Sequence, residues 1–297
     1  MSFWGAKTPL PDVWTMLPNL TSFMLMEPEL VTPFPADLCD HLRMVALLMY
    51  YATFTTPIPD SCYQESLFAL VFVGVSGPLE LSAAIGRSVN MVYLSFFSTS
   101  LTGRVPDEVG NLSQLSMLMF ANNPISCYTP SSLRNMSRLQ VLAFEGSSNA
   151  PCPFQLMNES NELAYIFLSG LDLRGLSTLE WIVWQPKLLS FVVINSIVND
   201  SLPSSFPLNA NISYVVVRNA HVTGELSSSF VEAFPNAVLI DISDNNLTGA
   251  LPASISDLTK MTVFNVSVNQ FSGVLPALSK CTSLKEVDAS FNADPLS

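Results

Sequence analysis

Pairs of apolar residues two positions apart recur along this chain about every 24 residues. Residues two apart point to the same face of a β-strand, so each pair predicts a short strand with one buried face. A fixed period of this length is typical of a solenoid, in which each coil buries its apolar side against its neighbours. The twelve pairs are Phe23/Leu25, Leu47/Met49, Phe68/Leu70, Leu94/Phe96, Leu118/Phe120, Leu142/Phe144, Ile166/Leu168, Phe191/Val193, Val215/Val217, Ile240/Ile242, Phe264/Val266 and Val287/Ala289. The sequence therefore predicts an α/β repeat solenoid of about 12 coils, with one strand per coil stacked into a long parallel sheet.

The period predicts one solenoid domain over residues 1–297. When the apolar pair takes positions 4 and 6, the coils begin at residues 20, 44, 65, 91, 115, 139, 163, 188, 212, 237, 261 and 284. Residues 1–19 then form a partial first coil, residues 20–283 eleven coils, and residues 284–297 an incomplete last coil. Solenoids need polar capping repeats, and neither end supplies one. We therefore expect a segment of a longer protein, with any signal peptide or anchor outside this chain.

The second half of each coil carries turn residues at fixed positions. Glycine, which tolerates positive φ, recurs at position 13, and proline recurs at position 16, where the return segment starts. Asparagine occupies position 9 in four coils, where its amide can bind backbone groups that the turn leaves open. These asparagines are Asn123, Asn245, Asn269 and Asn292.

Residues 241–252 (DISDNNLTGALP) and 266–276 (VSVNQFSGVLP) combine all of these features. They resemble the extracellular, plant-type leucine-rich repeat, whose pattern is LxxLxLxxNxLxGxIP, and the likeness extends over residues 20–297. Residues 10–21 (LPDVWTMLPNLT) are similar to the repeats of kinetoplastid surface antigens. The resemblance implies a horseshoe or superhelix with the parallel sheet on its concave face, in a receptor-like or surface-antigen protein.

Charge and hydropathy exclude several classes of function. The net charge is −12 with only 12 Lys and Arg, so the basic footprint that nucleic acids or anionic membranes attract is missing. The longest apolar runs, residues 44–51 and 67–75, are far shorter than the roughly 18 residues of a membrane span. We expect no nucleic-acid binding and no membrane insertion within this chain.

Sequons and cysteines favour an extracellular or cell-surface location. Asn-x-Ser/Thr glycosylation sequons occur at Asn19, Asn111, Asn135, Asn158, Asn199, Asn211, Asn246 and Asn265. The alternative is that these triplets occur only because they are part of the repeat consensus sequence. Cys39 and Cys62, and likewise Cys127 and Cys152, fall at nearly the same position of consecutive coils, which places each pair within disulfide reach. We expect two coil-to-coil disulfides and Cys281 as a buried thiol; the alternative is five buried cysteines.

Catalytic and metal-binding motifs are missing from the sequence. His41 and His221 have no partners at metal-ligand or triad spacing, and no nucleophile or phosphate-binding motif occurs. Asp241, Asp244 and Asp288 fall near one another and could bind Ca²⁺, but a solvated acidic face is the favoured reading. We expect a protein that is not an enzyme and has no cofactor and no metal.

Positions 3, 5, 7 and 8 of each coil are expected to face outward, and positions 3, 5 and 7 are unusually apolar over the first nine coils. Large exposed apolar patches usually mark interaction sites. The alternative is that these residues are present only because β-branched and aromatic residues favour strands. From coil ten these positions become polar, with Asp241, Asn265 and Asp288 at position 5. Leu67 and Val71 are also assigned to the outward columns. The predicted binding residues are Met24, Met26, Leu48, Tyr50, Tyr93, Phe97, Met117, Met119, Tyr165, Phe167, Val192 and Tyr214.

The sequence therefore favours a non-catalytic extracellular recognition solenoid that binds a protein or peptide through an apolar concave face. Such a domain would form part of a cell-surface or receptor-like protein. The alternative is a glycosylated surface-coat or adhesion spacer, in which the apolar face mediates self-association. The residues do not identify the ligand.

Overall fold

The computed structural model describes residues 16–26, 29–41, 43–125, 130–146, 152–153, 162–203 and 205–293. The chain divides into two compact units, Met1–Ser160 (unit 1) and Asn161–Ser297 (unit 2). Among the described residues, no helix has the length and apolar character that crossing a membrane requires. One continuous domain over residues 1–297 stays a prediction.

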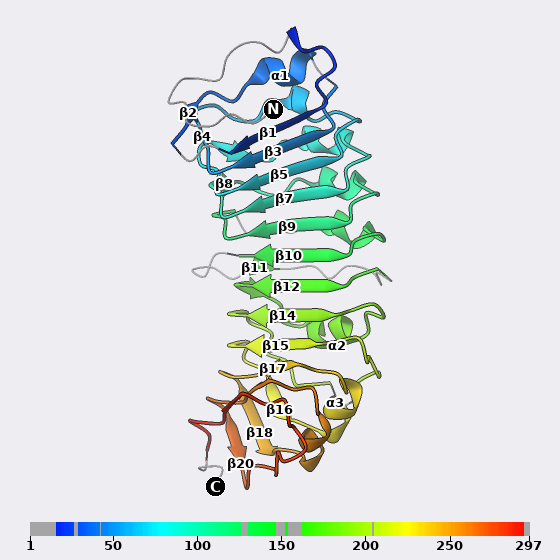
Figure 1. The fold of residues 1–297 in the computed structure, drawn as a ribbon, viewed down its shortest axis with the longest axis vertical. Helices are drawn as coiled ribbons and strands as arrows, with labels where there is room; N and C mark the ends of the chain where they lie inside the picture. Colours follow the sequence, from blue (N-terminus) through cyan, green and yellow to red (C-terminus); the bar gives the residue numbers. More distant parts are fainter. Residues whose placement is uncertain are drawn as a thin grey trace. The chain divides into compact units, whose positions relative to one another are not determined.

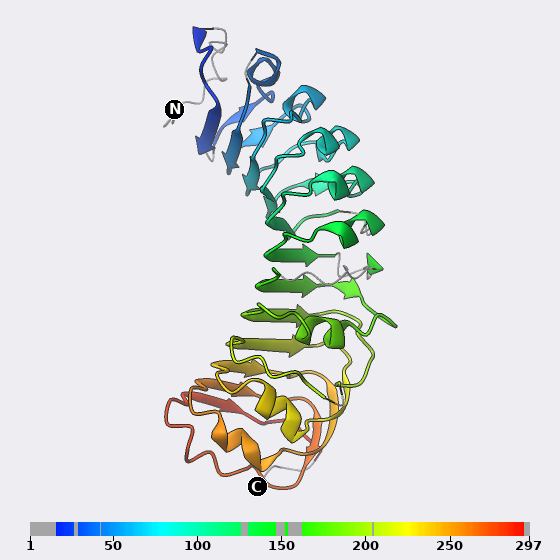
Figure 2. The ribbon, with the colours of Figure 1, turned by 90° about the vertical axis from the view of Figure 1, so that its right-hand side faces the viewer.

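Unit 1 is a stack of coils, each with one strand in a parallel sheet (Figure 1). Its strands are β1 (Ser22–Met26), β3 (Ala46–Tyr50), β5 (Ala69–Val73), β7 (Tyr93–Phe97), β9 (Met117–Ala121) and β10 (Val141–Glu145). The return segments contain α1 (Ala36–His41) and the 3-10 helices η2 (Asp60–Cys62), η3 (Ala83–Arg87), η4 (Asp107–Asn111) and η5 (Ser131–Asn135). The strands line one side of unit 1 and these helices line the other (Figure 2). Short strands β2 (Val31–Thr32), β4 (Thr53–Phe54), β6 (Leu79–Glu80), β8 (Leu101–Thr102) and β11 (Cys152–Pro153) follow the turns.

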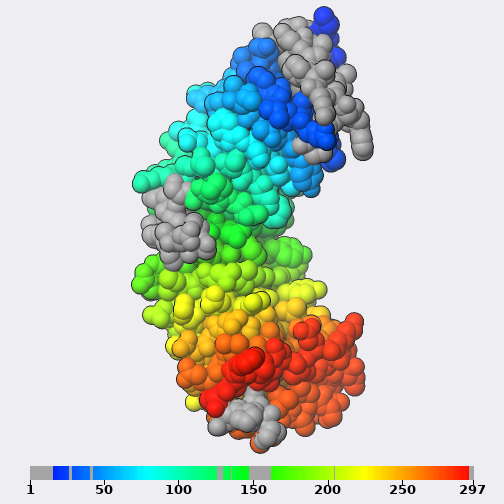
Figure 3. Space-filling view, turned by 90° about the vertical axis from the view of Figure 1, so that its left-hand side faces the viewer, coloured from blue at the N-terminus to red at the C-terminus, as the bar shows by residue number. Residues whose placement is uncertain are grey.

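Unit 2 repeats this plan. Its main strands are β12 (Tyr165–Ser169), β14 (Ser190–Ile194), β15 (Tyr214–Arg218), β17 (Leu239–Asp241), β19 (Val263–Asn265) and β21 (Glu286–Asp288). Helices α2 (Thr178–Val183), α3 (Ser228–Ala233) and η6 (Ala253–Asp257) lie on the return segments. A second parallel sheet joins β16 (Thr223–Glu225), β18 (Asn246–Ala250) and β20 (Gln270–Ser272), and β13 (Leu171–Asp172) follows β12. Within each unit, consecutive coils form successive layers in the space-filling view (Figure 3).

The predicted inward pairs form the core between the strands and the return segments. A column of phenylalanines runs through unit 1, with Phe72 and Phe96 at 5.0 Å and Phe120 and Phe144 at 5.7 Å between ring centroids. All four side chains are fully buried. Each contributes roughly 2–3 kcal/mol through burial, so the stack is held mainly by apolar contact between adjacent coils.

The prediction for coil three is wrong by two residues. The buried pair is Leu70 and Phe72, in register with Leu47 and Met49 of the preceding strand, instead of Phe68 and Leu70. Phe68 precedes the strand and is 41% exposed. Starting this coil at residue 67 also evens out the spacing to 23 and 24 residues. Leu67, assigned to the outward face, is therefore completely buried.

The last predicted pair is also only partly correct. Val287 is 39% exposed on β21. In the described part of the chain, β21 pairs with β19 on one side only. Within the described residues, Val287 is therefore packed by a neighbouring strand on one side only.

The asparagines at position 9 bind the preceding coil through both ends of the amide. Asn245 Nδ2 donates to the Val217 carbonyl at 2.6 Å, and its Oδ1 accepts from the backbone N–H groups of Ala220 and Val222 at 3.1 Å. Asn123, Asn269 and Asn292 make the same kind of connection to the coil before them. The amides thus satisfy backbone groups that the turns leave open, as expected.

The chain leaves the sheet through a residue with left-handed backbone geometry. Position 8, one to three residues after the end of the strand, has positive φ in ten coils, at Tyr51, Gly74, Ser98, Asn122, Gly170, Asn195, Asn219, Asp244, Val268 and Phe291. A bulky side chain is uncommon in this region of φ/ψ space. The turn geometry is therefore the same whichever residue occupies the position.

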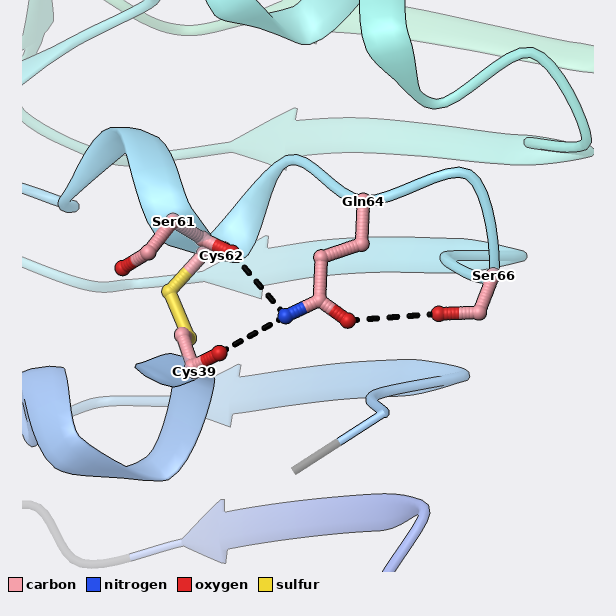
Figure 4. Close-up of a disulfide and its surroundings, with 5 residues drawn as sticks. All are labelled: Cys39, Ser61, Cys62, Gln64 and Ser66. Atoms are coloured by element: carbon pink, nitrogen blue, oxygen red, sulfur yellow. Dashed lines mark hydrogen bonds between the residues drawn. A yellow bond between two sulfur atoms is a disulfide. The ribbon is translucent and has the colours of Figure 1, made fainter. Parts of the chain in front are cut away.

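A disulfide joins Cys39 on α1 to Cys62 on η2, with a Cα–Cα distance of 4.7 Å (Figure 4). Gln64 reinforces the connection, because its Nε2 donates to the carbonyls of Cys39 at 2.7 Å and Ser61 at 3.0 Å. The expected disulfide between these two coils is present. Cys281 is a buried free thiol whose pKa is raised by burial. The predicted Cys127–Cys152 pair lies outside the described side chains.

Candidate binding surface

The outward side chains of the main strands form what we call the strand face: positions 3, 5 and 7 of each coil. Burial alternates along β1 and β3 of unit 1, so that every second residue of these two strands is at least partly exposed. Met24, Met26, Tyr93 and Phe97 are exposed by 38–48%. Leu48, Tyr50, Met117 and Met119 are partly exposed on the same face. All eight predicted residues of this unit are thus brought onto one surface.

The predicted residues of unit 2 lie on the first three strands of that unit. Tyr165 and Tyr214 are 49% and 47% exposed, and Phe167 and Val192 are partly exposed. Phe167 is directly in register with Val192 across β12 and β14. These four residues therefore form an apolar patch on unit 2.

Two aromatic residues of the unit 1 surface were not among the predicted binding residues. Phe68 packs edge-on against Tyr93, with 5.4 Å between the ring centroids. Tyr51 is 52% exposed, and its ring lies against Gly74. Even coil spacing would have placed Phe68 just before its strand, at the rim of the face. Tyr51 sits in the left-handed position after β3, for which the apolar pattern gives no signal.

At position 5, the strand face of unit 2 changes from apolar on β15 to polar on β17. Asp241 and Asp288 each accept two hydrogen bonds through Oδ1, from the backbone N–H and the hydroxyl of the serine two residues later. Asn265, between them in register, makes the same pair of bonds to Ser267. The Ser290 hydroxyl in particular holds the pKa of Asp288 below its usual value. These side chains are therefore fixed in position.

The three predicted acidic neighbours do not form a metal site. Asp244 forms an ion pair with Arg218, whose Nε lies 3.2 Å from its Oδ2. Across the described residues, no group of three His, Cys, Asp or Glu is arranged to hold a metal ion. His221 is exposed and has positive φ, and the side chain of His41 lies outside the described part.

Most of the sequons are sterically accessible. Asn19, Asn111, Asn199, Asn211 and Asn246 are exposed. Asn265 is partly buried on the strand face, where its Oδ1 is bound by Ser267. The side chains of Asn135 and Asn158 lie outside the described part. Glycosylation of the accessible sites stays a prediction.

Comparison with known proteins agrees with this geometry. The Leucine Rich Repeat family profile matches residues 236–258. "Receptor-like protein 32" of Arabidopsis thaliana is 27% identical over 144 residues, which is 46% of this chain and 16% of that protein. A receptor protein kinase-like protein of the same plant is 34% identical over 79 residues, covering 27% of this chain and 10% of that protein. The chain thus spans less than a fifth of these relatives.

Solved structures share the fold. The PEPR1–AtPEP1 crystal structure matches 96% of this chain and 40% of its own, with a TM-score of 0.79 and 24% identity. The plant peptide hormone receptor RGFR1 in complex with RGF2 matches 96% of this chain and 54% of its own, with a TM-score of 0.71 and 18% identity. A plant ice-binding protein also matches, over 91% of this chain and 81% of its own, with a TM-score of 0.56 and 15% identity. Together, the repeat geometry and these matches show the leucine-rich-repeat fold, with a matched repeat at residues 236–258.

Proposed function

We propose that this chain is a non-catalytic recognition domain that binds a protein or peptide through its apolar strand face. The observation that carries this proposal is the set of aromatic and methionine side chains left exposed in unit 1. An apolar surface of this kind on a parallel sheet is typical of an interaction site. Aromatic and methionine side chains are also enriched at interfaces, where they provide contact area and adaptability.

The relatives support the same function. Two similar proteins are named as receptor-like or receptor protein kinase-like, and one similar structure is that of the plant peptide hormone receptor RGFR1 in complex with RGF2. We propose by analogy that this chain is part of an extracellular or cell-surface receptor-like protein and that its partner is a peptide or a protein. Exposed sequons and the Cys39–Cys62 disulfide are consistent with this compartment.

The second candidate is a glycosylated surface-coat or adhesion spacer. The exposed sequons favour it, since five of them lie on accessible surface. In that case the apolar strand face would mediate contact between copies of the chain. The two functions differ in what a change of the strand face affects, which is either capture of a partner or the oligomeric state.

The test uses selection of random 12-residue peptides by display against the immobilised full chain. We expect enriched peptides that lose binding to a Tyr93→Ser/Phe97→Ser variant or, for unit 2, a Tyr165→Ser/Phe167→Ser variant. The matched control is Val31→Ser/Leu208→Ser, which removes two exposed apolar side chains (64% and 72% exposed) from outside the main strands. Equal loss in the control would contradict the proposal. Sedimentation of the same variants tests the alternative, for which only the oligomer size would change.

A further inference from the structure

We propose that the ligand segment bound by unit 1 carries no charged side chain where it contacts the strand face. This inference rests on the proposed function and specifies the chemistry of the partner. Positions 3, 5 and 7 of β1, β3, β5, β7, β9 and β10 contain no Lys, Arg, His or Asp. The one ionisable acid among them is Glu145, at the end of β10.

Glu145 is already engaged by the protein. Its Oε2 accepts a hydrogen bond from the backbone N–H of Asn122 at 2.6 Å. Asn122 has positive φ at the turn after β9, so the carboxylate serves a backbone group of the neighbouring coil. A ligand cation would have to compete with this bond to use the carboxylate as its counter-charge.

The remaining polar groups of this face are neutral. Tyr50 and Tyr93 present hydroxyl groups on exposed or partly exposed side chains. Ser95, between Tyr93 and Phe97 on β7, is 4% exposed, so a ligand has little access to its side chain. Tyrosine hydroxyls can donate to and accept from an uncharged peptide backbone. A charged ligand side chain would instead lose water without gaining an opposite charge, which is unfavourable.

Unit 2 shows that the fold does not require this absence of charge. The same outward positions hold Arg218 on β15, Asp241 on β17 and Asp288 on β21. Charged residues are therefore compatible with these positions of a coil. The absence of charge other than that of Glu145 on the unit 1 face is a property of its own residues, and it selects the chemistry of the ligand.

The peptides enriched on the full chain provide the test. The relevant pool is the set that loses binding to the Tyr93→Ser/Phe97→Ser variant. We expect this pool to be depleted in Asp, Glu, Lys and Arg relative to the starting library and enriched in aromatic and aliphatic residues. In a synthetic peptide from this pool, changing a residue essential for binding to Asp or Lys should weaken binding at least tenfold more than changing it to Ala.

A charge placed on the face gives an independent test. Met119→Lys should shift selection toward peptides that contain Asp or Glu, whereas the neutral, similarly shaped Met119→Gln should not. The inference is overturned if the pool requires a charged residue for binding to the unaltered chain, or if both variants select the same peptides. If enriched peptides bind the Tyr93→Ser/Phe97→Ser and Tyr165→Ser/Phe167→Ser variants normally, or if no peptide is enriched, the proposed function itself fails.

Discussion

The ring of Tyr51 lies directly over Gly74, so that a Cβ atom on Gly74 would stand 2.6 Å from Tyr51 Cδ1. Gly74 has a φ of +64° and occupies the same place in its coil as Tyr51 does in the preceding one. A missing side chain in coil three thus provides the space for an exposed aromatic side chain of coil two. This contact places Tyr51 at the rim of the unit 1 strand face.

Gly74→Ala should destabilise the fold by about 1–2 kcal/mol, because it adds a clash with Tyr51 to the strain of a left-handed alanine. The matched control is Gly175→Ala, which has a similar φ of +70° but no atom within 4 Å of the added Cβ. Denaturant unfolding of both variants measures the difference. Equal destabilisation would show that the Tyr51 contact is unimportant, and Tyr51→Ala should remove the excess.

Asn245→Ala should cost about 3 kcal/mol of stability, since it leaves the buried N–H groups of Ala220 and Val222 and the Val217 carbonyl without their side-chain partner. Asn236→Ala is the control, because Asn236 is partly exposed and makes one bond to the Ala210 carbonyl. We expect the control to cost less than about 1 kcal/mol. Thermal and denaturant unfolding give both values, and similar losses would contradict the role assigned to Asn245.

Removing the Cys39–Cys62 disulfide should lower stability by about 3 kcal/mol through greater freedom of the unfolded chain. A Cys39→Ala/Cys62→Ala variant tests this by denaturant unfolding. Cys281→Ala, which removes a buried free thiol, provides the comparison. Mass mapping should find Cys39 and Cys62 protected from alkylation until a reductant is added; labelling of both without reduction would refute the pairing.

Ser290→Ala should raise the pKa of Asp288, since the Ser290 hydroxyl is the main cause of the lowered pKa of this carboxyl. A folded-state pKa below the unfolded value stabilises the protein above the ordinary pKa, and this stabilisation is lost as the pH falls through the lowered value. The relevant window therefore lies below the ordinary value of 3.8. Titration by NMR measures the change, and Ser290→Thr, which keeps a hydroxyl, should leave the pKa low. An unchanged pKa in the alanine variant would contradict this cause.

The period of the apolar residues was enough to predict the sheet. Leu142 and Phe144, for example, pair in parallel register with Leu118 and Phe120, as the spacing requires. The error in coil three has a physical cause: Phe68, Leu70 and Phe72 are all apolar and two apart, so the pattern alone allows two registers. The choice between them is made by stacking on Leu47 and Met49, which is a contact between coils.

The strand face could be predicted only in part. Alternation places Tyr93 and Met119 outward from the sequence alone, but it places Ser95 outward as well, and Ser95 is only 4% exposed. Ser196 shows a similar limit at the turns. Its hydroxyl accepts a hydrogen bond from the backbone N–H of Leu171 at 3.2 Å. Ser196 thus makes one of the bonds that an asparagine makes at position 9 of other coils, in a coil whose sequence has no asparagine there.

The asparagine bonds have a consequence for the order in which the coils can be completed. Asn245 binds backbone groups of the preceding coil, and Asn269 in turn binds the Ile242 carbonyl and Leu247 N–H of the coil that contains Asn245. In these coils, the open backbone groups of each turn are hydrogen-bonded by an asparagine that lies about one coil further along the chain. During synthesis from the N-terminus, the newest such turn must therefore remain bonded to water until the following strand emerges and docks.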